Sequence, residues 1–298
     1  MAERSMGIKK IRPIVYVVLL TLGLSATAPA ADTPNISFEF TAVRIPRASQ
    51  VFPAAVSNAG VSVGTYVDKN NGVYGYKLDG TKVVRLDLPN SKRTYATGIK
   101  PDGLSVVGIY VNSANKQLGF LFKNGKFTDI PGPTGSALSG VYGINDAGHI
   151  VGEYADGHSV GGFLLEGTIY TTLFVPTSTE TFAYGINNHG KIVLGWLNSA
   201  GAQESSLYDG KMYKTIDVPG STNTAANGIN AAGDVVYGWV DGNNIEHGAL
   251  RHAGKFYKFD YPKAVQSFGA GINDNNVIVG AYQAVSNGPW RAFQATYK

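Results

Sequence analysis

Short runs of β-branched and aromatic residues, bounded by Gly, Asn, Asp or Pro, recur along the chain from Phe38 to its end. Ile150-Val151-Gly152-Glu153-Tyr154 and Gly119-Phe120-Leu121-Phe122 are two examples. Runs of this length and composition predict strands. No stretch has the sustained 3.6-residue periodicity of an amphipathic helix. The pattern therefore predicts an all-β chain.

The strand pattern returns at a nearly constant spacing. A Gly-Ile-Asn anchor starts at Gly143, Gly185, Gly228 and Gly271; Gly98-Ile99-Lys100 is a fifth copy and Ala55-Val56-Ser57 a degenerate sixth. Successive copies lie 43, 45, 42, 43 and 43 residues apart. After each anchor come a tight turn, a second strand, a variable loop, a third strand and a short hairpin into a fourth strand. Four strands in about 40–45 residues is the spacing of a propeller blade, whereas a β-helix coil is about half as long.

The two ends of the repeat region predict closure of a ring. The last copy reaches a third strand near Arg291-Ala292-Phe293 and has no fourth, while the segment from Phe38 to Pro46 resembles an isolated fourth strand. We therefore expect a six-bladed β-propeller of four-stranded antiparallel blades, in which the N-terminal strand completes the last blade. Such closure removes the open sheet edges that favour aggregation.

The first thirty residues have the pattern of a cleavable signal peptide. Four basic residues precede an apolar run from Ile14 to Leu24, and Ala28-Pro29-Ala30 follows. The run is short for a membrane span, although a retained anchor is the alternative interpretation. The expected organisation is a signal peptide at 1–30, a linker at 31–37 and one propeller at 38–298. The protein is then secreted, to the periplasm or the extracellular space, with no membrane association after cleavage.

The composition limits the classes of ligand and binding partner that we expect. Outside residues 1–30 the chain holds 21 basic and 20 acidic residues, and no cluster of Lys and Arg of the kind that binds nucleic acid. The sequence has no Cys, so we expect neither disulfides nor thiolate metal sites. The five His residues lack the spacing of a zinc motif. We expect no cofactor, no metal and a monomer.

Three features resemble catalytic or binding motifs. Gly157-His158-Ser159-Val160-Gly161 matches the G-x-S-x-G pattern of serine hydrolases, but a strand follows it where the hydrolase motif requires a helix. Four Asp residues recur near the end of the fourth strand, where local hydrogen bonds are the favoured interpretation: Asp87, Asp129, Asp217 and Asp260. Each second strand ends with an aromatic residue, for which packing between blades is favoured over sugar stacking: Tyr66, Tyr110, Tyr154, Trp196, Trp239 and Tyr282. None of these is taken as a catalytic residue.

The repeat resembles the bacterial extracellular repeats of the HAF family. The similarity rests on Gly-Ile-Asn, the turn, Ile-Val-Gly-x-Tyr, Gly-Phe-Leu-Leu and Asp-Val-Pro-Gly, and it covers about residues 38–298. The family tripeptide itself is only approximated, by Arg291-Ala292-Phe293 and His247-Gly248-Ala249. The resemblance implies export and repetition and supplies no catalytic residues.

A functional site is expected on the face that carries the variable loops. Those loops differ in every copy, whereas the anchor turns on the opposite face are uniform. The residue before each anchor Gly should lie near the mouth of the ring and also varies. The candidate binding residues are Tyr142, Tyr184 and Asn227 from that position, with Glu153, His158 and Trp290 from the loops and their flanks. We favour a module that binds a glycan, peptide or cell-surface partner; a lyase or hydrolase over the ring mouth is the alternative.

Overall fold

The computed structural model describes residues 36–136 and 138–298, and in these residues all regular structure is β. The expected signal peptide and most of the linker lie outside them. The strands of the first half are β1 (Phe38–Val43), β2 (Ala48–Val56), β3 (Ser62–Asp68), β4 (Val73–Asp79), β5 (Lys82–Leu86), β6 (Ser91–Ile99), β7 (Ser105–Asn112), β8 (Gln117–Lys123), β9 (Lys126–Ile130), β10 (Leu138–Ile144), β11 (Ile150–Ala155) and β12 (Val160–Glu166). Those of the second half are β13 (Ile169–Leu173), β14 (Glu180–Ile186), β15 (Ile192–Leu197), β16 (Gln203–Tyr208), β17 (Tyr213–Thr215), β18 (Asn223–Ile229), β19 (Val235–Val240), β20 (Glu246–His252), β21 (Lys255–Phe259), β22 (Gln266–Ile272), β23 (Val277–Gln283) and β24 (Arg291–Tyr297). The described residues contain no helix that could cross a membrane.

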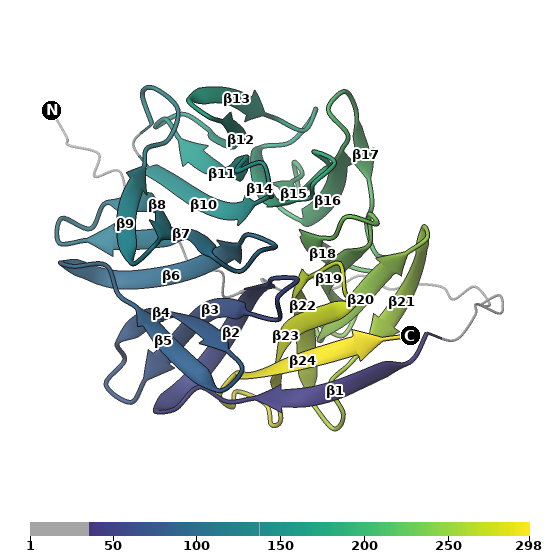
Figure 1. Cartoon of the computed structure of the whole chain (residues 1–298). Coiled ribbons are helices and arrows are strands. Elements are labelled where there is room, and N and C mark those ends of the chain that lie inside the picture. The colour runs from purple at the N-terminus through teal and green to yellow at the C-terminus, as the bar shows by residue number, and fades with distance from the viewer. Residues whose placement is uncertain (1–35, 137) are drawn as a thin grey trace, which may run out of the picture.

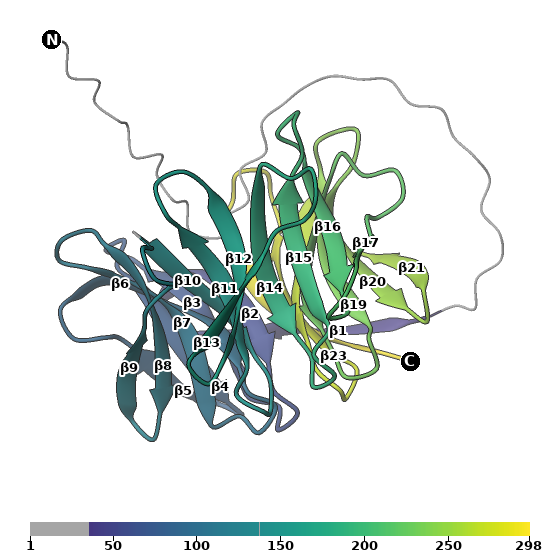
Figure 2. The same cartoon turned by 90° about the horizontal axis from the view of Figure 1, so that it is seen from above.

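Each predicted repeat forms one antiparallel group of strands, and the groups are arranged around a common centre (Figure 1). We number them units 1 to 6: β2–β5, β6–β9, β10–β13, β14–β17, β18–β21, and β22–β24 with β1. Single parallel contacts, Val73 with Arg93 and Val160 with Glu180, join units 1 and 2 and units 3 and 4 into eight-stranded sheets. Figure 2 shows neighbouring units side by side, with β14 next to β11 and β12.

The N-terminal strand pairs with the last strand of the chain, as predicted. β1 runs antiparallel to β24 from Phe38 opposite Tyr297 to Val43 opposite Ala292. The strand is shorter than the segment predicted from the sequence, because it ends at Val43 rather than at Pro46. Its Phe38 and Phe40 pack into an aromatic cluster with Phe259 and Phe293, at centroid distances of 4.9 to 6.4 Å. The core of unit 6 is thus built from both ends of the chain.

Glycine in the second strand makes room for an aromatic ring of the third. A Cβ on Gly152 would lie 2.8 Å from the Phe163 ring and 2.0 Å from the Gly140 carbonyl oxygen. The same pairing of a glycine with a ring occurs in units 1, 2 and 6: Gly64 with Tyr76, Gly108 with Phe120, and Gly280 with Phe293. In units 4 and 5 the larger residue is on the second strand and the smaller one on the third, with Leu194 opposite Ser206 and Tyr237 opposite Ala249. The volume of each pair is conserved, as close packing requires.

The anchor Gly is explained by the close approach of neighbouring innermost strands. A Cβ on Gly143 would lie 3.2 Å from the Cα of Gly185, and one on Gly228 would lie 3.2 Å from the Cα of Gly271. A Cβ on Gly271 would lie 2.6 Å from the carbonyl oxygen of Ala54, in unit 1. The contacts of unit 6 are therefore with unit 1 on one side and with unit 5 on the other.

The side chain of each anchor asparagine forms two kinds of hydrogen bond. These residues are Asn145, Asn187, Asn230 and Asn273. Their Oδ1 atoms accept hydrogen bonds of 2.9–3.0 Å from the fourth residue along, which closes the anchor turn. Their Nδ2 atoms donate to the carbonyl of the equivalent residue in the next unit. These donations run from Asn145 to Asn187 (3.2 Å), from Asn187 to Asn230 (2.9 Å), from Asn230 to Asn273 (3.3 Å) and from Asn273 to Ser57 (2.8 Å). The repeated Asn is thus a structural link between units.

The aromatic residues of the second strands are mainly core. Tyr66, Tyr110, Trp196, Trp239 and Tyr282 are buried, which confirms the packing interpretation for these five. Tyr154 is partly buried and packs against the core cluster around Phe163.

Candidate functional site

A β-bulge places the residue before each anchor Gly near the axis. In all six first strands the pairing register shifts at this residue, for example between Val141 and Gly143. A bulged residue is left out of the ladder and its side chain is re-aimed. The six bulged residues are Ala54, Thr97, Tyr142, Tyr184, Asn227 and Ala270, and all six line one cavity.

That cavity has a volume of about 400 Å³ and is the candidate site. Its wall includes residues that flank the variable loops on both sides, such as Val111 and Gln117, so it opens on the loop side of the molecule. Three of the bulged residues are small (Ala54, Thr97 and Ala270), and the space lies next to them, over units 1 and 2. The wall formed by units 3 and 4 consists of the rings of Tyr142 and Tyr184, whose centroids are 5.5 Å apart.

The cavity wall is aromatic, with a few polar groups. Phe52, Tyr95 and Phe268 supply rings from the first strands of units 1, 2 and 6. These three residues lie two positions before the bulged residue of their own strand. The polar lining side chains are Thr65, Asn71, Arg93, Thr97, Gln117 and Asn227 together with the two axial tyrosines. An apolar wall with a few directed polar groups is the usual composition of a small-molecule site.

Two of the polar lining side chains form hydrogen bonds with the backbone of a neighbouring unit. Thr97 Oγ1 donates to the Val141 carbonyl (2.5 Å) and Asn227 Nδ2 donates to the Gly269 carbonyl (2.7 Å). Both bonds join a unit to the next one. Thr97 and Asn227 are therefore partly structural.

Glu153 lies buried beside the cavity, behind two of its lining residues. Gln117 Nε2 lies 3.5 Å from Glu153 Oε1, and the carboxyl occupies space that is free because residue 140 is Gly. Burial raises the pKa of Glu153 to about 7, against the opposing effect of hydrogen bonds with Tyr142 and Gln117. Burial, with the Glu153 charge next, also raises the pKa of Tyr184. Glu153 of unit 3 thus contacts unit 2 through Gln117.

Glu246 is a second buried carboxyl close to the axis. A Cβ on Gly238 would lie 3.1 Å from Glu246 Oε1 and 3.7 Å from Asn227 Nδ2, so these side chains fill the space over Gly238. Burial raises the pKa of Glu246 to about 8. Sequence reasoning did not single out this residue, since its type gives no sign of burial.

The structure brings together part of the predicted site. Tyr142, Tyr184 and Asn227 line the cavity and Glu153 lies behind it. Trp290 is not a lining residue, but its ring centroid lies 6.3 Å from that of Phe52 and 5.2 Å from that of Phe268. His158 is exposed in the loop between β11 and β12 and is not part of the cavity wall.

Sequence reasoning missed the aromatic and cationic part of the wall: Phe52, Tyr95, Phe268, Arg93 and Gln117. The sequence does contain a pattern that could have indicated the aromatic residues of the wall. Positions three residues before the anchor carry Phe52, Tyr95, Gly140, Phe182, Ala225 and Phe268, and this position varies as much as the one before the anchor.

The other candidate motifs have structural roles. Ser159 lies in a turn closed by Asp156, whose Oδ1 accepts from the backbone N–H of His158 (2.8 Å) and of Ser159 (2.9 Å). Strand β12 follows at once, so the hydrolase elbow is absent. The described residues contain no group of three or more His, Cys, Asp or Glu side chains placed to hold a metal ion.

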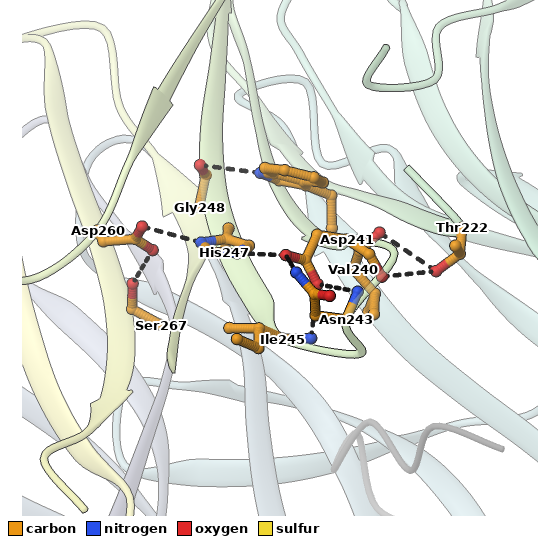
Figure 3. A network of polar contacts seen from close by, with 10 residues as sticks. Thr222, Val240, Asp241, Asn243, Ile245, His247, Gly248, Asp260 and Ser267 are labelled. Carbon is orange, nitrogen blue, oxygen red and sulfur yellow. Dashed lines mark hydrogen bonds and ion pairs between the residues drawn. The ribbon is translucent and has the colours of Figure 1, made fainter. Parts of the chain in front are cut away.

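His247 contacts two carboxylates. It lies on β20, with Nδ1 2.8 Å from Asp260 Oδ2 and Nε2 3.6 Å from Asp241 Oδ2 (Figure 3). Its ring stacks on Trp239 at 4.8 Å. Asp260 also accepts from Ser267 (2.9 Å), which confirms local hydrogen bonding for this member of the recurring Asp set.

Known structures share this architecture at low sequence identity. The lectin of Aleuria aurantia, solved in complex with Fucα1-6GlcNAc, matches with a TM-score of 0.54 at 13% identity, over 84% of this chain and 96% of the lectin. Another structure of this fungal lectin is described as a six-bladed β-propeller with a fucose recognition mode. A putative TolB of Agrobacterium tumefaciens matches with a TM-score of 0.56 at 16% identity, over 88% of this chain and 98% of that protein.

The chain has a β-propeller fold. No family model and no curated protein sequence matches it. At these identities the structural matches establish the fold alone, and the function has to be argued from the site.

Proposed function

We propose that this protein is an exported, monomeric, closed six-bladed β-propeller of the HAF repeat type, which binds a glycan in the loop-side cavity. The observation that carries the binding proposal is the composition of the cavity wall. A pyranose has faces of C–H groups and a rim of hydroxyls. Aromatic rings such as Phe52 and Tyr95 suit the faces, and side chains such as Asn71 and Gln117 suit the hydroxyls.

The size of the cavity is consistent with a small ligand. Its 400 Å³ lies near the lower end of the range of roughly 300–1,000 Å³ for ligand pockets. One or two sugar units are therefore the expected ligand. The fold supports the same class, because lectins are among the structures that share it.

Closure of the ring is supported by contacts between the first and last repeats. Asn273 donates to Ser57, and Asn58 and Asp274 exchange two hydrogen bonds of 2.7 and 2.9 Å. The same kinds of bond join units 3 and 4, where Asp146 and Asn188 form the equivalent pair at 2.9 and 2.7 Å. A rigid closed scaffold keeps the cavity wall preorganised, which lowers the cost of binding.

Binding is favoured over catalysis by the chemistry of the wall. Among the described residues, those that line the cavity include no Asp, Glu or His. Hydrolysis or elimination at a sugar requires a placed acid and base, usually carboxylates. Glu153 adjoins the cavity, but Tyr142 and Gln117 lie beside its carboxyl. A lyase or hydrolase remains the second hypothesis, and turnover of any bound glycan would support it.

A glycan array followed by calorimetric titration tests the proposal. The mature chain, residues 31–298, should retain at least one glycan class. The Tyr95→Ala variant should then bind about tenfold more weakly or worse, since it loses an aromatic wall. Tyr257→Ala is the matched control, because Tyr257 is also partly buried but lies on the outer strand β21. Absence of glycan binding, or equal affinity for both variants, would contradict the proposal.

A further inference from the structure

Among the described residues that line the cavity, Arg93 is the one with a charged side chain. Arg93 lies at the start of β6, opposite Val111 of β7 and next to Val73 of β4. It is exposed, and among the described residues it forms no ion pair. Its guanidinium is hydrogen-bonded to Tyr95, another lining residue. The side chain is thus oriented along the wall by a neutral partner and keeps donors free.

The rim around Arg93 is also cationic. Lys92 and Lys116 are sequence neighbours of the lining residues Arg93 and Gln117, and Lys69 lies in the loop that contributes Asn71. All three lysines are exposed. The one acid of these two loops, Asp68, is committed to its own turn, where Oδ1 accepts from the N–H of Asn70 and of Gly72 at 2.8 Å.

Units 3, 4 and 5 each carry an acidic residue at the loop ends of their strands. Asp156, Glu180 and Asp241 lie at the loop ends of units 3, 4 and 5. Among the described loops between second and third strands, lysines occur only in units 1 and 2, as Lys69 and Lys116, and these two units supply most of the cavity wall.

We infer that the ligand is an anionic sugar, a uronate or a sialic acid, whose carboxylate pairs with Arg93 at the mouth of the cavity. The inference rests on the proposed glycan binding and specifies its substrate class. A guanidinium offers two parallel N–H donors that match a carboxylate, and such charge-assisted pairs are stronger than neutral hydrogen bonds. The rings of Phe52 and Tyr95 then face the pyranose. The lysines of the rim raise the rate of encounter with an anion.

Matched pairs of sugars test the inference by calorimetric titration. Each pair has the same core with and without the carboxylate: methyl β-D-glucuronide and methyl β-D-glucoside, methyl α-D-galacturonide and methyl α-D-galactoside, 3′-sialyllactose and lactose. In at least one pair the anionic sugar should bind roughly 10- to 100-fold more tightly, which is the contribution of one charge-assisted pair. Cyclohexanecarboxylate, which has the charge without the hydroxyls, should bind far more weakly than the anionic sugar.

Variants at Arg93 assign the preference to this residue. Arg93→Gln should abolish the preference for the anionic member of the pair. Arg93→Lys should keep part of the preference. The control is Lys126→Gln, which removes an exposed cation from the outer strand β9.

Three results would overturn the inference. These are equal affinity for both members of every pair, a preference that survives in Arg93→Gln, and binding of cyclohexanecarboxylate as tight as that of the anionic sugar. In the first two cases neutral sugars still bind and the proposed function stands. If no sugar on the array or in the titrations binds, the proposed function fails as well.

Discussion

Replacing Asn273 with alanine tests whether the last repeat is joined to the first. Asn273 is buried at 4% exposure, and its Oδ1 accepts from Asn275 and Val277 within its own turn. Its Nδ2 donates to the carbonyl of Ser57 at 2.8 Å. Asn187 is its internal counterpart, with the same 4% exposure, the same two turn bonds and a 2.9 Å donation to Asn230. The two residues differ only in which units they link.

The expected magnitude follows from these bonds. Loss of the two turn bonds alone costs about 1 kcal/mol, because the freed N–H groups can be solvated. Loss of the link removes one of two hydrogen bonds to the carbonyl, because Ser57 still accepts from Gly60 and Asn230 from Gly233 at 3.0 Å; this adds roughly 0.5–1.5 kcal/mol. Asn273→Ala and Asn187→Ala should therefore each lower the free energy of unfolding by about 2 kcal/mol.

Asn112→Ala is the control for the turn bonds. Asn112 Oδ1 accepts from Ala114 and Lys116 at 3.0 and 2.9 Å, and the residue lies in a loop within unit 2. Its replacement should cost only about 1 kcal/mol. Urea unfolding of residues 31–298, followed by tryptophan fluorescence and circular dichroism, measures all three variants. If Asn273→Ala costs no more than Asn112→Ala while Asn187→Ala costs more, the reasoning about closure is refuted.

Three further predictions concern the scaffold. Deletion of residues 31–46 removes β1 and should abolish the cooperative thermal transition, whereas deletion of 31–35 should leave it unchanged; an unaltered transition in the longer deletion would show that β1 is dispensable. Gly271→Ala should destabilise the protein by roughly 1–3 kcal/mol in urea unfolding, because its Cβ would lie 2.6 Å from the Ala54 carbonyl oxygen; Gly242→Ala, which meets no atom within 4 Å, is the control, and equal costs would contradict the argument. Burial raises the pKa of Glu246 from 4.5 to about 8, so ionisation is unfavourable in the folded state and stability should fall as pH rises between these values. Glu246→Gln should reduce this fall by up to about 5 kcal/mol and leave the part due to Glu153, whose pKa burial also raises, while Glu39→Gln at an exposed site should keep the whole fall.

The scaffold was predictable from the sequence because it is repeated. The spacing of the anchors predicted how the strands are grouped. The two ends of the repeat region predicted that the N-terminal strand, β1, pairs with the last strand, β24. The structural reasons for the repeated Gly and Asn residues could not be inferred from the sequence. Gly143 was interpreted only as the start of a repeat anchor and Asn187 as the first residue of a turn, yet both lie at contacts between units. Such contacts join residues about 43 positions apart, so no local rule indicates them.

The candidate site was predictable only in part because it depends on irregular positions. The residue before the anchor was expected near the mouth of the ring, and the β-bulge explains how it comes to line the cavity. The position of the cavity depends on which of those residues are small, as at Ala54 and Thr97, and on aromatic residues two positions earlier. Arg93 was missed because a single Arg beside Lys92 looks like an ordinary exposed strand end. His158 was chosen for its loop and lies away from the cavity.

A crystal structure of residues 31–298 with the tightest ligand from the glycan array tests the central claim most directly. The account predicts a sugar ring in the loop-side cavity, with one face against Phe52 or Tyr95 and hydrogen bonds to side chains such as Asn71 and Gln117. A ligand bound on the outer strands or on the anchor-turn side, with the cavity empty, would contradict it.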